Sequence, residues 1–153
     1  MNPLSNLPPN PYIVGIPIKK PEDFFGREEV FSAIADNLSQ DVQLTLLYGQ
    51  RRIGKSSVLN LIPKKISSDK FIFIAFDFQT VERLSNAEIL CRIAREILEK
   101  LEALGYLPDE HLLLEHLAEN IIGDYTIFGR EFLPEVYRQI VDKKIVFLWD
   151  EFD

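Results

Sequence analysis

The chain has 153 residues, of which 46% are hydrophobic and 27% charged, and its formal net charge at pH 7 is −7. The length suits one globular domain, and the composition excludes a disordered or fibrous chain. The negative charge makes nucleic acid an unexpected partner, because non-specific binding to it needs a cationic surface. No apolar run approaches the roughly 20 residues that cross a bilayer, and the single cysteine excludes an internal disulfide. With no signal-like N-terminus, the sequence predicts a cytoplasmic protein without a membrane partner.

The first half of the chain begins with an arm that is rich in proline. Six of the nine prolines fall in residues 1–21, which predicts an extended segment instead of a helix. After Arg27, apolar residues recur at helical spacing and predict an amphipathic helix of about three turns. Residues 44–48 are nearly all apolar and precede a glycine, which is typical of a strand buried on both faces. A helix is then expected over 55–62, ended by Pro63.

The middle of the chain predicts a strand and a long helix. Residues 71–76 form a second apolar run, with Asp77 at its end. Ser85 and Glu88 have the spacing of a capping box, and the apolar stripe that follows predicts a helix until Gly105 stops it.

The last third predicts two helices and a strand. Residues 109–121 and 130–142 have helical patterns, with Pro134 near the first turn of the second helix. Residues 145–149 form a third buried strand. Strands that alternate with helices predict an α/β fold with a mostly parallel sheet.

The segment between the first strand and its helix carries the clearest motif. It matches G-x-x-x-x-G-K-[ST], the P-loop or Walker A sequence, in the strand-then-helix context that the motif needs. Backbone N–H groups of such a loop point at phosphate oxygens, and the helix adds the positive end of its dipole. Lys55 is expected to reach the β- and γ-phosphates and the Ser56 hydroxyl to bind Mg²⁺. The predicted residues of this ATP site are Gly49, Gln50, Arg51, Arg52, Ile53, Gly54, Lys55, Ser56 and Ser57.

Two acidic residues end the third predicted strand, where a Walker B pair is expected. Asp150 is the expected Mg²⁺ ligand, and Glu151 the general base that activates the attacking water, with Lys55 as the other catalytic residue. Without the glycine loop, the pair would be an ordinary solvated strand end.

Several polar residues near these motifs have two interpretations. Arg51 and Arg52 are either solvent-facing charges or contacts to phosphate or to a partner domain. Asp77 and Gln79 either cap the loop after their strand or touch the water shell of the magnesium ion.

Three segments, in this order, resemble the AAA-like ATPases of prokaryotic STAND type. They are Phe24-Phe25-Gly26-Arg27-Glu28, the glycine loop with Ser57, and Phe147-Leu148-Trp149-Asp150-Glu151-Phe152. The likeness covers about residues 12–153 and implies a three-layer P-loop NTPase fold. It also implies that Ile18 and the residues Phe25, Gly26 and Arg27 lie beside the adenine, although this second segment is equally interpreted as a helix start with an aromatic plug.

The resemblance also implies what this chain does and what it lacks. ATPases of this type are multidomain signalling switches, in which a further strand inserts between the Walker A and Walker B strands and a helical lid and effector domains follow. Residues 22–153 are therefore expected to be the Walker A to Walker B part of the domain. We expect Mg²⁺-dependent ATP hydrolysis in the complete protein, with self-association or effector domains as partners, and weak activity and poor solubility in this chain alone. The alternatives are a non-catalytic nucleotide-binding assembly module and a truncated, inactive fragment.

Overall fold

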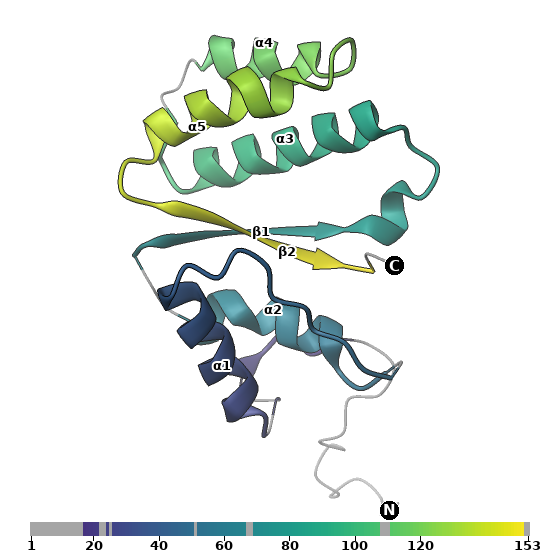
Figure 1. Cartoon of the computed structure of the whole chain (residues 1–153), viewed down its shortest axis with the longest axis vertical. Helices are drawn as coiled ribbons and strands as arrows, with labels where there is room; N and C mark the ends of the chain where they lie inside the picture. Colours follow the sequence, from purple (N-terminus) through teal and green to yellow (C-terminus); the bar gives the residue numbers. More distant parts are fainter. Residues whose placement is uncertain are drawn as a thin grey trace, which may run out of the picture. The chain divides into compact units, whose positions relative to one another are not determined.

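The computed structural model describes residues 17–21, 24, 26–50, 52–66, 69–107 and 111–151 (Figure 1). The predictions for most of the arm, and those for Phe25, Arg51 and Phe152, lie outside these residues. The chain divides into two units, Met1–Ser67 and Ser68–Asp153. In the described ranges, no helix is both long enough and apolar enough to span a membrane.

The first unit contains two helices, α1 (Glu28–Ser39) and α2 (Lys55–Lys65), and the sequence predicted both. Lys65 joins them, because its Nζ lies 3.5 Å from the Glu28 carboxylate and 5.3 Å from the centroid of the Phe31 ring. The second helix runs three residues past its expected end. Pro63 is accommodated in its last turn, where a proline removes only one hydrogen bond of the helix.

The prediction of a buried strand at residues 44–48 is wrong. The sheet of the described residues has two strands, and neither includes this segment. Most of its side chains are open to solvent, with Leu44 70%, Leu46 71% and Tyr48 91% exposed, while Leu47 is half-buried. An extended segment becomes a strand only when its N–H and C=O groups bond to a neighbour, and among the described residues no strand pairs with this one. The apolar run therefore indicates that the segment could be buried, although it is mostly exposed in this structure.

The second unit contains the sheet and most of the helices. Its elements are β1 (Phe71–Asp77), the 3₁₀ turn η3 (Phe78–Val81), α3 (Asn86–Ala103), α4 (Leu112–Asn120), the π-helical turn η4 (Phe128–Phe132), α5 (Leu133–Gln139) and β2 (Lys144–Asp150). The two strands pair in parallel, from Phe71 opposite Lys144 to Asp77 opposite Asp150. This confirms a mixed α/β structure with a parallel sheet, which has two strands among the described residues.

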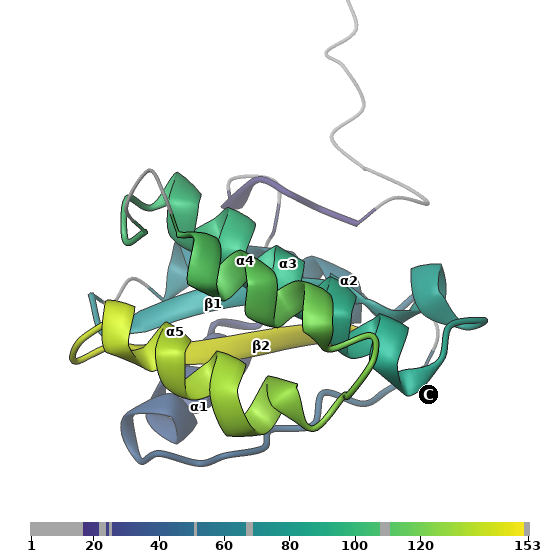
Figure 2. The same ribbon diagram turned by 90° about the horizontal axis from the view of Figure 1, so that it is seen from above.

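Helices α3, α4 and α5 lie on one side of this sheet and cover it when seen from above (Figures 1 and 2). The core of the unit lies between them, because strand alternation sends Ile72, Ile74 and Phe76 to the helical side. The fully buried residues that pack with them include Ala94, Ile97, Leu101, Ile121, Phe132 and Val136. Burial of one large apolar side chain stabilises a fold by about 1.5–3 kcal/mol, so this layer holds β1 and β2 in register.

The long helix α3 starts and stops where the sequence predicted. Ser85 and Glu88 form a complete capping box, and Gly105 follows the helix with φ 73°, in the left-handed region that favours glycine. Pro134 stands in the first turn of α5, also as predicted. The π-helical turn η4 before it was not foreseen, because its i→i+5 bonding leaves no simple spacing in the sequence.

Candidate functional site

The glycine loop leads directly into α2, and the local structure explains why both fixed positions of the loop are glycine. Gly54 stands just before the helix with φ 95°, a conformation that residues with a side chain rarely adopt. A Cβ atom added to Gly49 would lie 3.2 Å from Cγ2 of Ile53, so a larger residue there would crowd the loop.

The start of α2 offers backbone N–H groups to an anion. Its N-cap residue, Gly54, has no side chain that could cap the helix, and the first turn contains no acidic residue. The first N–H groups of an α-helix have no partner within the helix, and the helix dipole adds positive potential at this end. The start of α2 therefore has the properties of a phosphate-binding helix terminus.

Lys55, the first residue of α2, turns back over the loop. Its Nζ donates a hydrogen bond of 3.1 Å to the carbonyl of Gly49, and within the loop the amide of Ile53 donates to the carbonyl of Gln50 at 3.3 Å. The ammonium group thus joins the first glycine of the motif to the first residue of the helix.

The two serines that follow Lys55 have different surroundings. Ser57 is only 6% exposed, and its hydroxyl accepts a hydrogen bond of 2.9 Å from the amide of Ile18. The sequence placed Ser57 in the nucleotide site and gave no sign of this contact. Ser56 is half-buried, and its hydroxyl is an oxygen donor of the kind that Mg²⁺ prefers.

Arg27 also contacts the loop, from outside it in the sequence. Its Nη2 donates a short hydrogen bond to the carbonyl of Ile53, 26 residues later. Its Nη1 lies 4.0 Å from the position that a Cβ atom of Gly54 would take. Arg52, in contrast, is exposed, with a left-handed φ of 64°. The sequence did not reveal the Arg27 contact because Arg27 and Ile53 lie 26 residues apart in the chain.

In the second unit, β1 and β2 bring two carboxylates to the same edge of the sheet. Asp77 and Asp150 are register partners at the carboxyl ends of the strands. One oxygen of Asp77 accepts a hydrogen bond of 2.9 Å from the amide of Gln79, which confirms the loop-capping interpretation of Asp77. One oxygen of Asp150 accepts from the amide of Glu151 at 3.1 Å.

Glu151 is exposed, and its backbone has φ 53°, a conformation that non-glycine residues adopt rarely. Such outliers concentrate at functional sites, where the surrounding structure maintains them. Within the described ranges, no group of three or more His, Cys, Asp and Glu side chains is arranged to hold a metal ion. Any magnesium here would depend on few protein oxygens, with phosphates and water as its other ligands.

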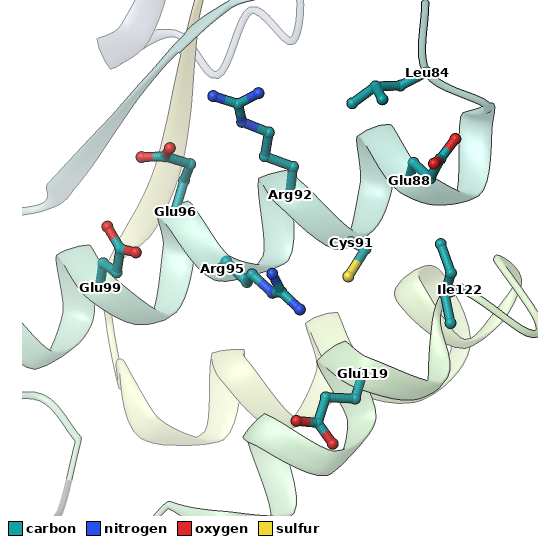
Figure 3. A pocket seen from close by; sticks show the side chains of 9 residues that line it. All are labelled: Leu84, Glu88, Cys91, Arg92, Arg95, Glu96, Glu99, Glu119 and Ile122. Carbon is teal, nitrogen blue, oxygen red and sulfur yellow. The ribbon is translucent and has the colours of Figure 1, made fainter. Parts of the chain in front are cut away.

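A separate surface pocket of about 630 Å³ opens beside α3 (Figure 3). It is lined by Leu84, Glu88, Cys91, Arg92, Arg95, Glu96, Glu99, Glu119 and Ile122. None of these belongs to the predicted nucleotide site. The Cys91 thiol donates a hydrogen bond of 3.3 Å to the carbonyl of Ala118 and is mostly buried, as is typical of a cysteine that packs in a core.

Comparison of the chain with protein-family models, with curated proteins and with solved structures found no match. The function must therefore be inferred from the residues and their geometry.

Proposed function

We propose that this chain binds ATP and Mg²⁺ at the glycine loop, and that Asp150 and Glu151 serve ATP hydrolysis in a P-loop ATPase of the regulatory or signalling type. The observation that carries this proposal is the loop itself. It passes through a left-handed Gly54 into a helix that no described side chain caps, and Lys55 reaches back to the Gly49 carbonyl. An ordinary glycine turn before a helix needs neither the uncapped start nor the lysine at the first helical position.

The chemistry of the loop suits a triphosphate. Backbone N–H groups donate to phosphate oxygens without adding a charged side chain, and the helix dipole favours a bound anion. The Lys55 ammonium can exchange its hydrogen bond to Gly49 for stronger, charge-assisted bonds to the phosphates.

The donor atoms of the proposed metal ligands suit Mg²⁺. The Ser56 hydroxyl and the Asp150 carboxylate are both hard oxygen donors, and magnesium sites at phosphates use only one or two such groups from the protein. When bound, the ion neutralises charge on the phosphate oxygens. In this proposal the Glu151 carboxylate accepts a proton from the attacking water, and Lys55 holds the terminal phosphate.

Calorimetric titration with ATP in the presence of Mg²⁺ tests the phosphate assignment. Lys55→Ala is expected to weaken ATP binding by about 100-fold or more, because the phosphates lose their main cationic partner. Lys100→Ala is the matched control, since it removes an equal charge from the exposed last turn of α3 and should leave the affinity unchanged. Equal affinity in wild type and Lys55→Ala would contradict the proposed site.

A further inference from the structure

Arg27 touches the glycine loop at a single peptide group. Its guanidinium donates to the carbonyl of Ile53 and lies beside Gly54, the next residue. That peptide group joins the loop to the N-terminal end of α2, where the proposed phosphate site begins. Within the motif, Lys55 holds the carbonyl of Gly49 in a similar way.

We propose that Arg27 is a positioning residue, which orients the Gly54 N–H toward bound phosphate by holding the Ile53 carbonyl. This inference rests on the proposed function. The peptide bond is planar and trans, so its C=O and N–H point in opposite directions. When Arg27 fixes the Ile53 carbonyl on its own side of the loop, the Gly54 N–H is directed away from the guanidinium. Rotation of this peptide would otherwise be easy, because Gly54 has no side chain to restrict it.

The position of Arg27 is itself fixed by its neighbours. Gly26 and Arg27 both have left-handed backbones, with φ of 81° and 63°, and α1 begins at the next residue. Glu28 pairs with Lys65, the last residue of α2, while Arg27 bonds to Ile53, just before its start. An 11-residue helix is about 16 Å long, so adjacent residues of the chain hold opposite ends of α2. Arg27 therefore reaches the loop from a backbone that α2 already anchors.

A residue that positions the loop and a residue that contacts the base would affect different parts of the bound ligand. The resemblance to STAND-type ATPases implies that Arg27 lies beside the adenine, which would make it a base contact. A residue that acts through the Gly54 N–H instead affects any ligand that carries the phosphates. Inorganic tripolyphosphate has the phosphates but neither base nor ribose, so it separates the two roles.

The test measures Kd for Mg²⁺-ATP and for Mg²⁺-tripolyphosphate in wild type, Arg27→Ala, Arg27→Lys and the control Arg83→Ala. Arg83 is exposed and lies in the second unit. We expect Arg27→Ala to weaken both ligands by the same factor, about 5- to 10-fold. Arg27→Lys keeps a cationic hydrogen-bond donor and should recover part of the affinity, and Arg83→Ala should match wild type. Weakening of ATP alone would overturn the proposal in favour of a base contact, and unchanged affinities would overturn it outright.

A second measurement needs no ligand and protects the test against misfolding. In ¹⁵N-glycine-labelled protein, Arg27→Ala should shift or broaden the amide signal of Gly54, while those of Gly105 and Gly123 stay in place. A Gly54 signal that does not move would overturn the proposed contact, even if ATP binding is intact. If wild type binds neither ATP nor tripolyphosphate, the proposed function fails and the role of Arg27 in phosphate binding fails with it. If wild type binds both and Arg27→Ala changes neither, only the inference about Arg27 is wrong.

Discussion

The backbone amide of Ile18 donates a hydrogen bond of 2.9 Å to the hydroxyl of Ser57, 39 residues later in the chain. This bond distinguishes the two adjacent serines, Ser56 and Ser57. Ser57 attaches the segment before α1 to the first turn of α2, and a second contact joins Lys64 to the carbonyl of Lys19 at 2.5 Å. Ser56 is the serine proposed to bind Mg²⁺.

The two serines should therefore respond differently to removal of the hydroxyl. Ser57→Ala leaves the part-buried Ile18 amide without its acceptor and should lower the free energy of unfolding by about 1–2 kcal/mol. Ser56→Ala should change stability little but abolish the gain in ATP affinity that Mg²⁺ provides. Urea unfolding and ATP titration with and without Mg²⁺ measure the two effects. Loss of Mg²⁺ dependence in Ser57→Ala, with Ser56→Ala behaving like wild type, would reverse these assignments.

Glu151→Gln tests the proposed general base. The amide has nearly the same size as the carboxylate but cannot accept the proton of the attacking water. In the complete protein, we expect ATP affinity within about twofold of wild type and phosphate release reduced by at least 100-fold, in line with typical contributions of general bases. Steady-state phosphate release and calorimetry on the same preparations measure both. Turnover retained in Glu151→Gln would assign the base to another residue, and a complete wild-type protein that binds ATP without releasing phosphate would favour the non-catalytic alternative.

The sequence predicted local structure best where a few neighbouring residues determine it. Ser85 and Glu88 specify the start of α3 by hydrogen bonds over three residues, and the apolar runs of β1 and β2 match the strands of the structure. The run at residues 44–48 was equally apolar and yet forms no strand here. Its pattern indicates that the segment can be buried, but pairing depends on a partner strand, which a local pattern does not contain.

The same limit applies to the candidate site. The spacing of Gly49, Gly54 and Lys55 revealed the loop, because all its fixed residues lie within eight positions of the chain. The contact between Arg27 and Ile53 depends on how α1 packs on α2, and nothing in either short segment specifies it. The sequence also placed Ser57 in the nucleotide site beside Ser56, since only the fold shows that the Ser57 hydroxyl is already bonded to the amide of Ile18.

The capping box of α3 predicts a stability effect that depends on pH. The Ser85 hydroxyl and the Ser85 amide both donate to the Glu88 carboxylate at 2.7 Å, and these bonds lower the pKa of Glu88 from its ordinary value of 4.5. A lowered pKa means that the carboxylate stabilises the fold above its unfolded-state pKa, and that this contribution is lost as pH falls through the folded-state pKa.

Ser85→Ala should accordingly lower Tm by about 2–4 °C at neutral pH. The difference from wild type should shrink once the pH is lowered below the folded-state pKa of Glu88, because the carboxyl is then protonated in both proteins. It should not vanish there, because the Glu88 amide also donates to the Ser85 hydroxyl, at 3.4 Å. Thermal unfolding at neutral pH and below that pKa is the measurement. A difference that stays constant or grows on acidification would show that the carboxylate does not take part.

The segment 44–48 allows the most direct test of structure against sequence pattern. Leu46 is 71% exposed, whereas Leu61 of α2 is fully buried. Leu46→Ser should therefore change the free energy of unfolding by less than about 0.5 kcal/mol, and Leu61→Ala should cost about 2–5 kcal/mol. If residues 44–48 instead formed the buried strand that the apolar run predicts, Leu46→Ser would be as costly as Leu61→Ala.

Leu46→Ser should raise the solubility of the chain although it changes stability little. Leu44, Leu46 and Tyr48 present apolar side chains to solvent on a segment without a strand partner among the described residues, and such segments favour association between chains. Leu46→Ser should raise the protein concentration at which the chain remains monomeric in light scattering. Glu96→Ser, on the polar part of α3, is the control and should not raise it. The opposite result would be a Leu46→Ser variant that loses 2 kcal/mol or more of stability and is no more soluble than wild type. It would mean that the segment is buried, because replacing a buried leucine costs much stability and removes no exposed apolar surface.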